Sequence, residues 1–111
     1  MSATLHNLEK TIAGRRGGDP ASSYVAKLFA RGRGKIAQKV GEEAVETVIA
    51  ALSGDAPAVT GEAADLLFHL LVLLDDCGVA LDDVLAELER REGVSGIAEK
   101  AGRPPSLTSR E

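Results

Sequence analysis

Residues 63–74 read AADLLFHLLVLL, and this stretch decides the fold because, wound as a helix, it is apolar on nearly every side. A helix of this kind is buried on most sides. In a chain of 111 residues it therefore lies either at the centre of a helix bundle or in a dimer interface. The polar residues of this region share one side of the helix: Glu62, Asp65, His69 and Asp76. Buried acids without partners are costly, so we expect them to be paired or to bind a metal ion.

The rest of the chain predicts further helices and no strand. The composition is 44% apolar but only 3% aromatic, which favours helices because strands favour β-branched and aromatic residues. Apolar spacing and the Gly, Pro and Ser positions predict helices at about 4–13, 22–29, 35–52, 58–77 and 81–90, with a basic flexible break at 31–34. We expect an all-α protomer of four to five helices in one domain, residues 1–92, followed by a flexible tail, residues 93–111.

A second group of acids lies on the preceding helix, at Glu42, Glu43 and Glu46. Carboxylates this close repel one another and need either solvent or a cation. The short connection makes the two helices antiparallel neighbours, so Glu43 and Glu46 are expected to face Glu62 and Asp65. Four carboxylates without cysteine suit a hard cation, Mg²⁺ or Mn²⁺. Because Mg²⁺ is commonly shared with substrate phosphates, this pattern indicates phosphate chemistry. Alternatively, the three acids of the earlier helix are ordinary surface residues.

His69 lies one helical turn after Asp65 and has three interpretations. The first is a core imidazole that is hydrogen-bonded to a carboxylate or to a backbone carbonyl. The second is a group behind the metal ion that orients Asp65. Direct coordination of the metal is the least favoured.

The net charge of −4 is unevenly distributed along the chain. Residues 14–39 hold seven basic residues and one acid, whereas residues 42–92 hold thirteen acids and two basic residues. Such blocks can serve two ligands, although most of these charges are expected on solvated helix faces. The acidic half would repel a phosphate backbone and aromatic residues are scarce, so we expect no nucleic-acid partner.

The single Cys77 excludes a disulfide framework and a cysteine-based zinc site, and a reducing compartment is the default. No secretory signal is visible at the N-terminus. The longest apolar run, residues 66–74, has nine residues and includes His69. A membrane-spanning helix needs roughly 20 apolar residues. We therefore expect a cytoplasmic protein without a membrane partner.

At these residues the chain resembles the phosphoribosyl-ATP pyrophosphohydrolases of histidine biosynthesis, which belong to the all-α MazG-like superfamily of nucleoside-triphosphate pyrophosphohydrolases. The superfamily pattern E-E-x-x-E, then E-x-x-D, matches the acids of both helices, with fifteen residues between Glu46 and Glu62. The narrower match is upstream, in SYVAKL (residues 23–28) and KIAQKVG (residues 35–41). The resemblance covers about residues 5–91. Two mild departures are Val25 and Phe68, which stand where Thr and Tyr are common.

The resemblance implies Mg²⁺-dependent hydrolysis of phosphoribosyl-ATP to phosphoribosyl-AMP and pyrophosphate by a homodimer, and a tetramer is compatible with the sequence. Its implied roles are metal binding, a general base, binding of substrate phosphates and orientation of the metal ligands. Metal binding falls to Glu43, Glu46, Glu62 and Asp65; the general base is Glu42 or Glu43; the phosphate ligands are Lys27, Lys35 and Lys39; and His69 lies behind the metal ligands. For the lysines, the alternative is a solvated basic stretch.

Two other functions stay open at this stage. One is a housekeeping pyrophosphohydrolase of (deoxy)nucleoside triphosphates, and the other is a non-catalytic helical module for dimerisation or metal binding. Di-iron bundles use Glu-x-x-His pairs, and no histidine lies three residues after any of these glutamates, which weakens the second alternative. The length leaves no room for the next enzyme of the pathway, so we expect the free-standing, single-activity form.

Overall fold

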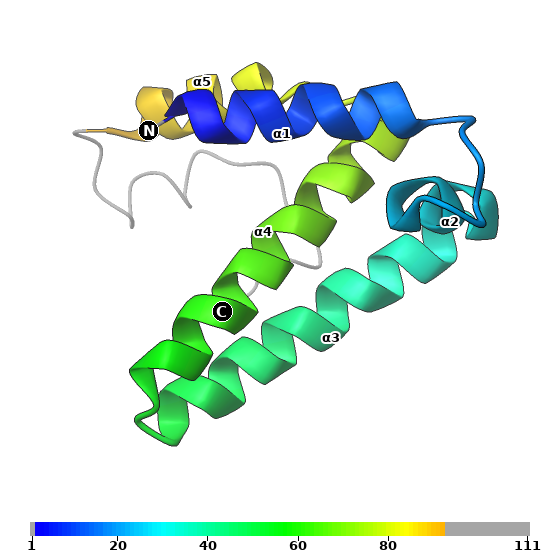
Figure 1. The fold of residues 1–111 in the computed structure, drawn as a ribbon. Coiled ribbons are helices and arrows are strands. Elements are labelled where there is room, and N and C mark those ends of the chain that lie inside the picture. Colours follow the sequence, from blue (N-terminus) through cyan, green and yellow to red (C-terminus); the bar gives the residue numbers. More distant parts are fainter. Residues whose placement is uncertain (1, 93–111) are drawn as a thin grey trace. The chain divides into compact units, whose positions relative to one another are not determined.

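The computed structural model describes residues 2–92, which form five helices and no strand (Figure 1). The helices are α1 (Ser2–Arg15), α2 (Tyr24–Arg31), α3 (Arg33–Leu52), α4 (Ala56–Cys77) and α5 (Leu81–Arg91). This confirms the all-α class. The chain divides into two units, Met1–Leu81 and Asp82–Glu111, which are described separately. The predicted domain over residues 1–92 stays a prediction, and the predicted tail, residues 93–111, lies outside the described residues.

The first unit is organised around the antiparallel pair α3 and α4, which lie side by side along most of their length (Figure 1). Helix α1 packs against α4, and α2 packs against α3. The side chains of Ile12, Ile36 and Val72, from three different helices, are fully buried. The pairing of α3 with α4 is the arrangement that the short connection between them predicts.

Helix α4 begins two residues earlier than expected. The Asp55 side chain caps it by accepting a hydrogen bond of 3.1 Å from the backbone N–H of Ala58. Pro57, which precedes the predicted helix over residues 58–77, lies in the first turn of α4. A proline is tolerated there because the N–H groups of the first turn have no helical acceptor in any case.

The basic break is shorter than predicted. Ser23 caps α2, accepting a hydrogen bond of 3.1 Å from the backbone N–H of Ala26. Between α2 and α3 only Gly32 leaves the helical conformation, at φ 96° and ψ 170°, and α3 starts at Arg33. The expected flexible segment over 31–34 is therefore wrong: it is a sharp corner made by one glycine.

An ion-pair cluster joins the start of α3 to the ends of α1 and α4. Arg33 Nε donates to Asp76 at 2.8 Å, and Arg16 donates to Asp75 at 3.1 Å. The hydrogen bond from Arg33 is the main reason that the pKa of Asp76 is lowered. The Arg16 guanidinium also lies 4.1 Å from the centre of the Phe29 ring. Asp76 is thus paired, which was one of the two expectations for it.

Within one protomer α4 is less enclosed than its sequence predicts. Its buried residues are His69, Leu71 and Val72, while Leu67 remains 47% exposed. Among residues 2–92, α4 is the one helix that is long and apolar enough to cross a membrane. The core helix of a soluble protein meets the same criterion. In the second unit, paired Arg90 and Arg91 lower the pKa of Glu87 on α5 to about 2.

The corner at Gly32 gives a stability prediction. Its φ and ψ fall in a region that only glycine adopts readily, so Gly32→Ala should destabilise the fold by about 1–3 kcal/mol. Gly34 is the matched control, since it lies inside α3 and a Cβ there meets no atom within 4 Å. Gly34→Ala should stabilise the helix by up to about 1 kcal/mol. Urea denaturation at fixed protein concentration measures both values, and equal midpoints would contradict strain at Gly32.

Candidate active site

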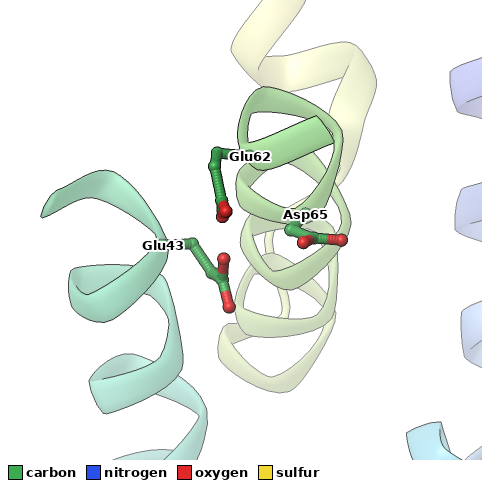
Figure 2. Close-up of side chains that lie close together, drawn as sticks. All are labelled: Glu43, Glu62 and Asp65. Carbon is green, nitrogen blue, oxygen red and sulfur yellow. The ribbon is translucent and has the colours of Figure 1, made fainter. Parts of the chain in front are cut away.

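Three carboxylates from α3 and α4 meet in the first unit. Glu43, Glu62 and Asp65 each offer one oxygen, and these oxygens lie within 4.8 Å of one another. Figure 2 shows the Glu43 and Glu62 side chains extending toward each other between the two helices. We call these three residues the carboxylate cluster. The structure brings together acids that the i, i+3 spacings and the antiparallel pairing predict as neighbours.

Two oxygen atoms of the cluster are buried without a hydrogen-bond partner: Oε1 of Glu43 and Oε1 of Glu62. Glu43 itself is only 7% exposed. A buried acceptor without a donor costs about 1–3 kcal/mol, and more when it is charged. An arrangement of this kind needs a proton or a cation, so the donor set fits a hard divalent metal ion.

Glu46 lies at the edge of the carboxylate cluster. It is exposed and is not among the three residues that converge, but its carboxyl contacts Glu62. The neighbouring Glu46 carboxyl is the largest cause that raises the pKa of Glu62 from 4.5 to about 7, followed by burial and then by Glu43. Such a shift is expected when neighbouring carboxylates cannot all ionise.

Glu42 points elsewhere. Its carboxylate accepts a hydrogen bond of 2.7 Å from the Gln38 amide and lies 3.4 Å from Lys39 Nζ. These two contacts, led by Gln38, lower the pKa of Glu42. A carboxylate with a lowered pKa is a weaker base, which disfavours Glu42 as the general base. Of the two candidate bases, Glu43 is the one that belongs to the carboxylate cluster.

A basic pocket lies next to the cluster, with a volume of about 230 Å³. Its lining includes the three lysines proposed from the sequence to bind phosphate, Lys27, Lys35 and Lys39. The other lining residues are Tyr24, Leu28 and Arg31. Lys39 connects this basic pocket to the cluster, because its Nζ atom lies 4.0 Å from Glu43 Oε2.

Tyr24 and Arg31 are the residues that the sequence interpretation missed. A signal was available, since Tyr24, Lys27, Leu28 and Arg31 recur at i, i+3, i+4 and i+7 and so share one side of α2. Tyr24 was noted only as part of a motif, without a role.

His69 is buried beside the cluster, 5% exposed. Its Nδ1 lies 2.8 Å from the main-chain oxygen of Asp65, and its Nε2 lies 2.8 Å from the Tyr24 hydroxyl. The imidazole therefore contacts the backbone of Asp65, and no bond to the Asp65 carboxylate accompanies it. Of the three interpretations, the structure corresponds to the hydrogen-bonded core imidazole.

The chain matches a known family over nearly all of its described residues. Residues 5–92 match the profile of phosphoribosyl-ATP pyrophosphohydrolase. The chain belongs to the phosphoribosyl-ATP pyrophosphohydrolase family. The resemblance stated from the two acidic motifs is thereby confirmed, and the chain is an enzyme of the hydrolase class.

Relatives of similar length support this family membership. A phosphoribosyl-ATP pyrophosphatase of Rhizorhabdus wittichii is 70% identical, over 94% of this chain and 98% of the relative. Proteins of the same name from Novosphingobium aromaticivorans and Erythrobacter litoralis are 68% and 66% identical, over 89% and 90% of this chain and 92% and 96% of their own lengths. The carboxylate cluster and the basic pocket both lie inside the matched residues.

The raised pKa of Glu62 predicts an unusual dependence of stability on pH. In the folded chain Glu62 holds its proton up to about pH 7, whereas the unfolded chain releases it near 4.5. Between these values the folded state binds more protons, so this residue lowers stability as pH rises. The difference in melting temperature between Glu62→Gln and the parent, measured with EDTA present, should therefore shift in favour of Glu62→Gln as the pH rises from 4.5 to above 7. Glu89→Gln, on α5, is the control and should follow the parent. A constant difference between Glu62→Gln and the parent would contradict the shift.

Proposed function

We propose that this enzyme hydrolyses phosphoribosyl-ATP to phosphoribosyl-AMP and pyrophosphate, the second step of histidine biosynthesis, and that it requires Mg²⁺. The observation that carries the proposal is the carboxylate cluster joined through Lys39 to a pocket lined by cations. An acidic site for a metal ion beside a basic site for phosphates is what a triphosphate substrate needs. Relatives that bear the name phosphoribosyl-ATP pyrophosphatase support phosphoribosyl-ATP as the substrate.

Glu43, Glu62 and Asp65 are the residues that would hold Mg²⁺ or Mn²⁺, with Glu46 as a further ligand through its contact with Glu62. The orphaned Oε1 atoms of Glu43 and Glu62 support this assignment. When bound, a divalent ion neutralises the charge that develops on the phosphoryl oxygens.

The remaining work falls to the side chains of the chain itself. Lys27, Lys35 and Lys39 bind phosphate oxygens by charge-assisted hydrogen bonds. Glu43 is the better candidate for the base that accepts a proton from the attacking water, because Glu42 is held by Gln38 and Lys39. The low exposure of Glu43 keeps bulk water from competing for that proton.

The proposal is tested by measuring pyrophosphate release from phosphoribosyl-ATP, with and without Mg²⁺. ATP and deoxynucleoside triphosphates serve as competing substrates. Glu43→Gln should lower kcat/KM by roughly a hundredfold or more, as expected for loss of a base or a metal ligand. Glu89→Gln, outside the cluster, should keep parental activity. Equal turnover of deoxynucleotides would favour the housekeeping alternative, and Glu43→Gln activity within roughly threefold of the parent would contradict the site.

We further propose that the enzyme is a homodimer in the cytoplasm, assembled through the outward side of α3. One side of α3 packs on α4 and buries Ile36, Glu43 and Ala50. The opposite side is also apolar and is more than half exposed in one protomer, at Val45, Val48, Ile49 and Leu52. A helix that is apolar on two opposite sides needs a second cover, and a second copy of the chain supplies one. Leu67 of α4 adds to the exposed apolar area.

A pair of variants tests this interface. Val48→Glu combined with Leu52→Glu should convert the protein to monomers, because like charges would meet on the buried side of the dimer. Asn7→Glu, an exposed position on α1, is the matched control and should leave the oligomeric state unchanged. Sedimentation equilibrium at low micromolar concentration distinguishes the species, and a folded monomer of the parent chain would rule out the dimer.

A further inference from the structure

The basic pocket contains one cation that has no role in the proposed function, Arg31. Four of the six lining residues are cationic and none is acidic. The cations lie four residues apart on each helix: Lys27 and Arg31 on α2, and Lys35 and Lys39 on α3. Like charges at this spacing share one side of a helix and destabilise it. A hollow that gathers them is therefore suited to an anion.

The cations of this pocket are mostly free to bind a ligand. Apart from Lys39, none of them forms an ion pair with an acidic side chain of residues 2–92. Arg31 and Arg33 lie on either side of the corner at Gly32, and the corner separates their roles. Arg33 donates to Asp76 at 2.8 Å, whereas Arg31 lines the basic pocket. The charge of Arg31 is thus available to a bound anion.

The carboxylate cluster and the basic pocket follow one another along α3. Glu43, Lys39 and Lys35 recur at four-residue steps on one side of the helix, with a rise of about 6 Å per step. Lys39 Nζ lies 4.0 Å from Glu43 Oε2, and Arg31 comes after Lys35, across the corner at Gly32. A chain of phosphates bound along this side therefore has one phosphate at the carboxylates and the next phosphates among the cations.

The chemistry of the lining selects the kind of group that fits. Lysine and arginine side chains only donate, Leu28 is apolar, and the Tyr24 hydroxyl lies 2.8 Å from His69 Nε2. Sugar hydroxyls also need acceptors, and the described lining residues include no carboxylate and no amide side chain. The oxygens of a diphosphate accept hydrogen bonds, and this group concentrates more charge in a small volume than a sugar phosphate does. It matches a pocket of about 230 Å³ that is lined by donors.

We propose that the basic pocket binds the terminal diphosphate of the substrate, the part that is released as pyrophosphate, and that Arg31 is one of its ligands. The inference rests on the proposed function for the identity of the substrate. Because the pocket is built from cations of the chain itself, inorganic pyrophosphate alone should occupy it without a metal ion.

Isothermal titration calorimetry with inorganic pyrophosphate tests the inference on the full chain. EDTA is present at pH 8, and the ionic strength of about 0.15 M screens charges beyond a Debye length of about 8 Å. Arg31→Ala should weaken pyrophosphate binding about tenfold, as expected for loss of a charge-assisted hydrogen bond. Arg15→Ala is the matched control, because it removes the same charge from the exposed end of α1, outside the pocket, and should leave the Kd unchanged.

Two sugar phosphates identify which part of the substrate the pocket holds. AMP and ribose 5-phosphate should each bind roughly tenfold more weakly than pyrophosphate, or weaker still, because they carry less charge for the same donors. If ribose 5-phosphate binds as tightly as pyrophosphate and depends equally on Arg31, the pocket holds a sugar phosphate and the inference is wrong. An absence of pyrophosphate binding, or equal affinity in Arg31→Ala and the parent, would also overturn it.

Failure of this inference can be told apart from failure of the proposed function. The Arg31 side chain is exposed, so Arg31→Ala should fold, and its melting temperature checks this. The titration needs no turnover, so a chain that binds pyrophosphate through Arg31 but does not hydrolyse phosphoribosyl-ATP would refute the proposed function alone. With turnover, pyrophosphate should inhibit competitively, and Arg31→Ala should raise its inhibition constant about tenfold.

Discussion

The structure depends on one costly arrangement: carboxylates of two helices meeting at an apolar helix–helix contact. Glu43 is 7% exposed on the side of α3 that also buries Ile36 and Ala50. In these surroundings an unpaired charge is expensive, and the nearest groups of Glu62 are other carboxylates. The site is stabilised only when a proton or a cation enters it. The surrounding apolar contacts hold α3 and α4 together against the repulsion, and they also keep the ligand oxygens in place.

The rest of the first unit brings cations close to these acids without cancelling them. The corner at Gly32 turns the chain from α2 into α3, so that basic residues of both helices line one pocket. Arg16 and Arg33, which belong to the same basic stretch, instead pair with Asp75 and Asp76 at the far end of α4. The basic stretch therefore divides into a part that pairs with the end of α4 and a part that lines the basic pocket, and Lys39 lies both in the pocket lining and beside Glu43.

The sequence was sufficient for the helices and for the meeting of the acids, because both follow from periodicity and from a short connection. It was not sufficient for fine placement. Glu42 directly precedes Glu43 in sequence, but a shift of one position on a helix turns a side chain by about 100°. Glu42 is therefore separated from the carboxylate cluster and binds Gln38 instead. The exposure of apolar residues on α4 and at Val48 could also not be predicted from the sequence. Helical periodicity indicates which side of a helix is apolar, but it does not indicate what covers that side.

Metal binding and folding are coupled in such a site. Apolar surroundings that raise the cost of the empty carboxylate cluster also strengthen its attraction for a cation, because both effects come from poor solvation of charge. Replacing a cluster acid can therefore stabilise the metal-free chain while removing the function, a conflict common at active sites. A ligand that binds only the folded state restores stability in proportion to its concentration over its Kd. Under the proposed function, the fold of this enzyme is most stable when its site is filled, and its apolar helices tolerate buried acids because a bound cation would neutralise them.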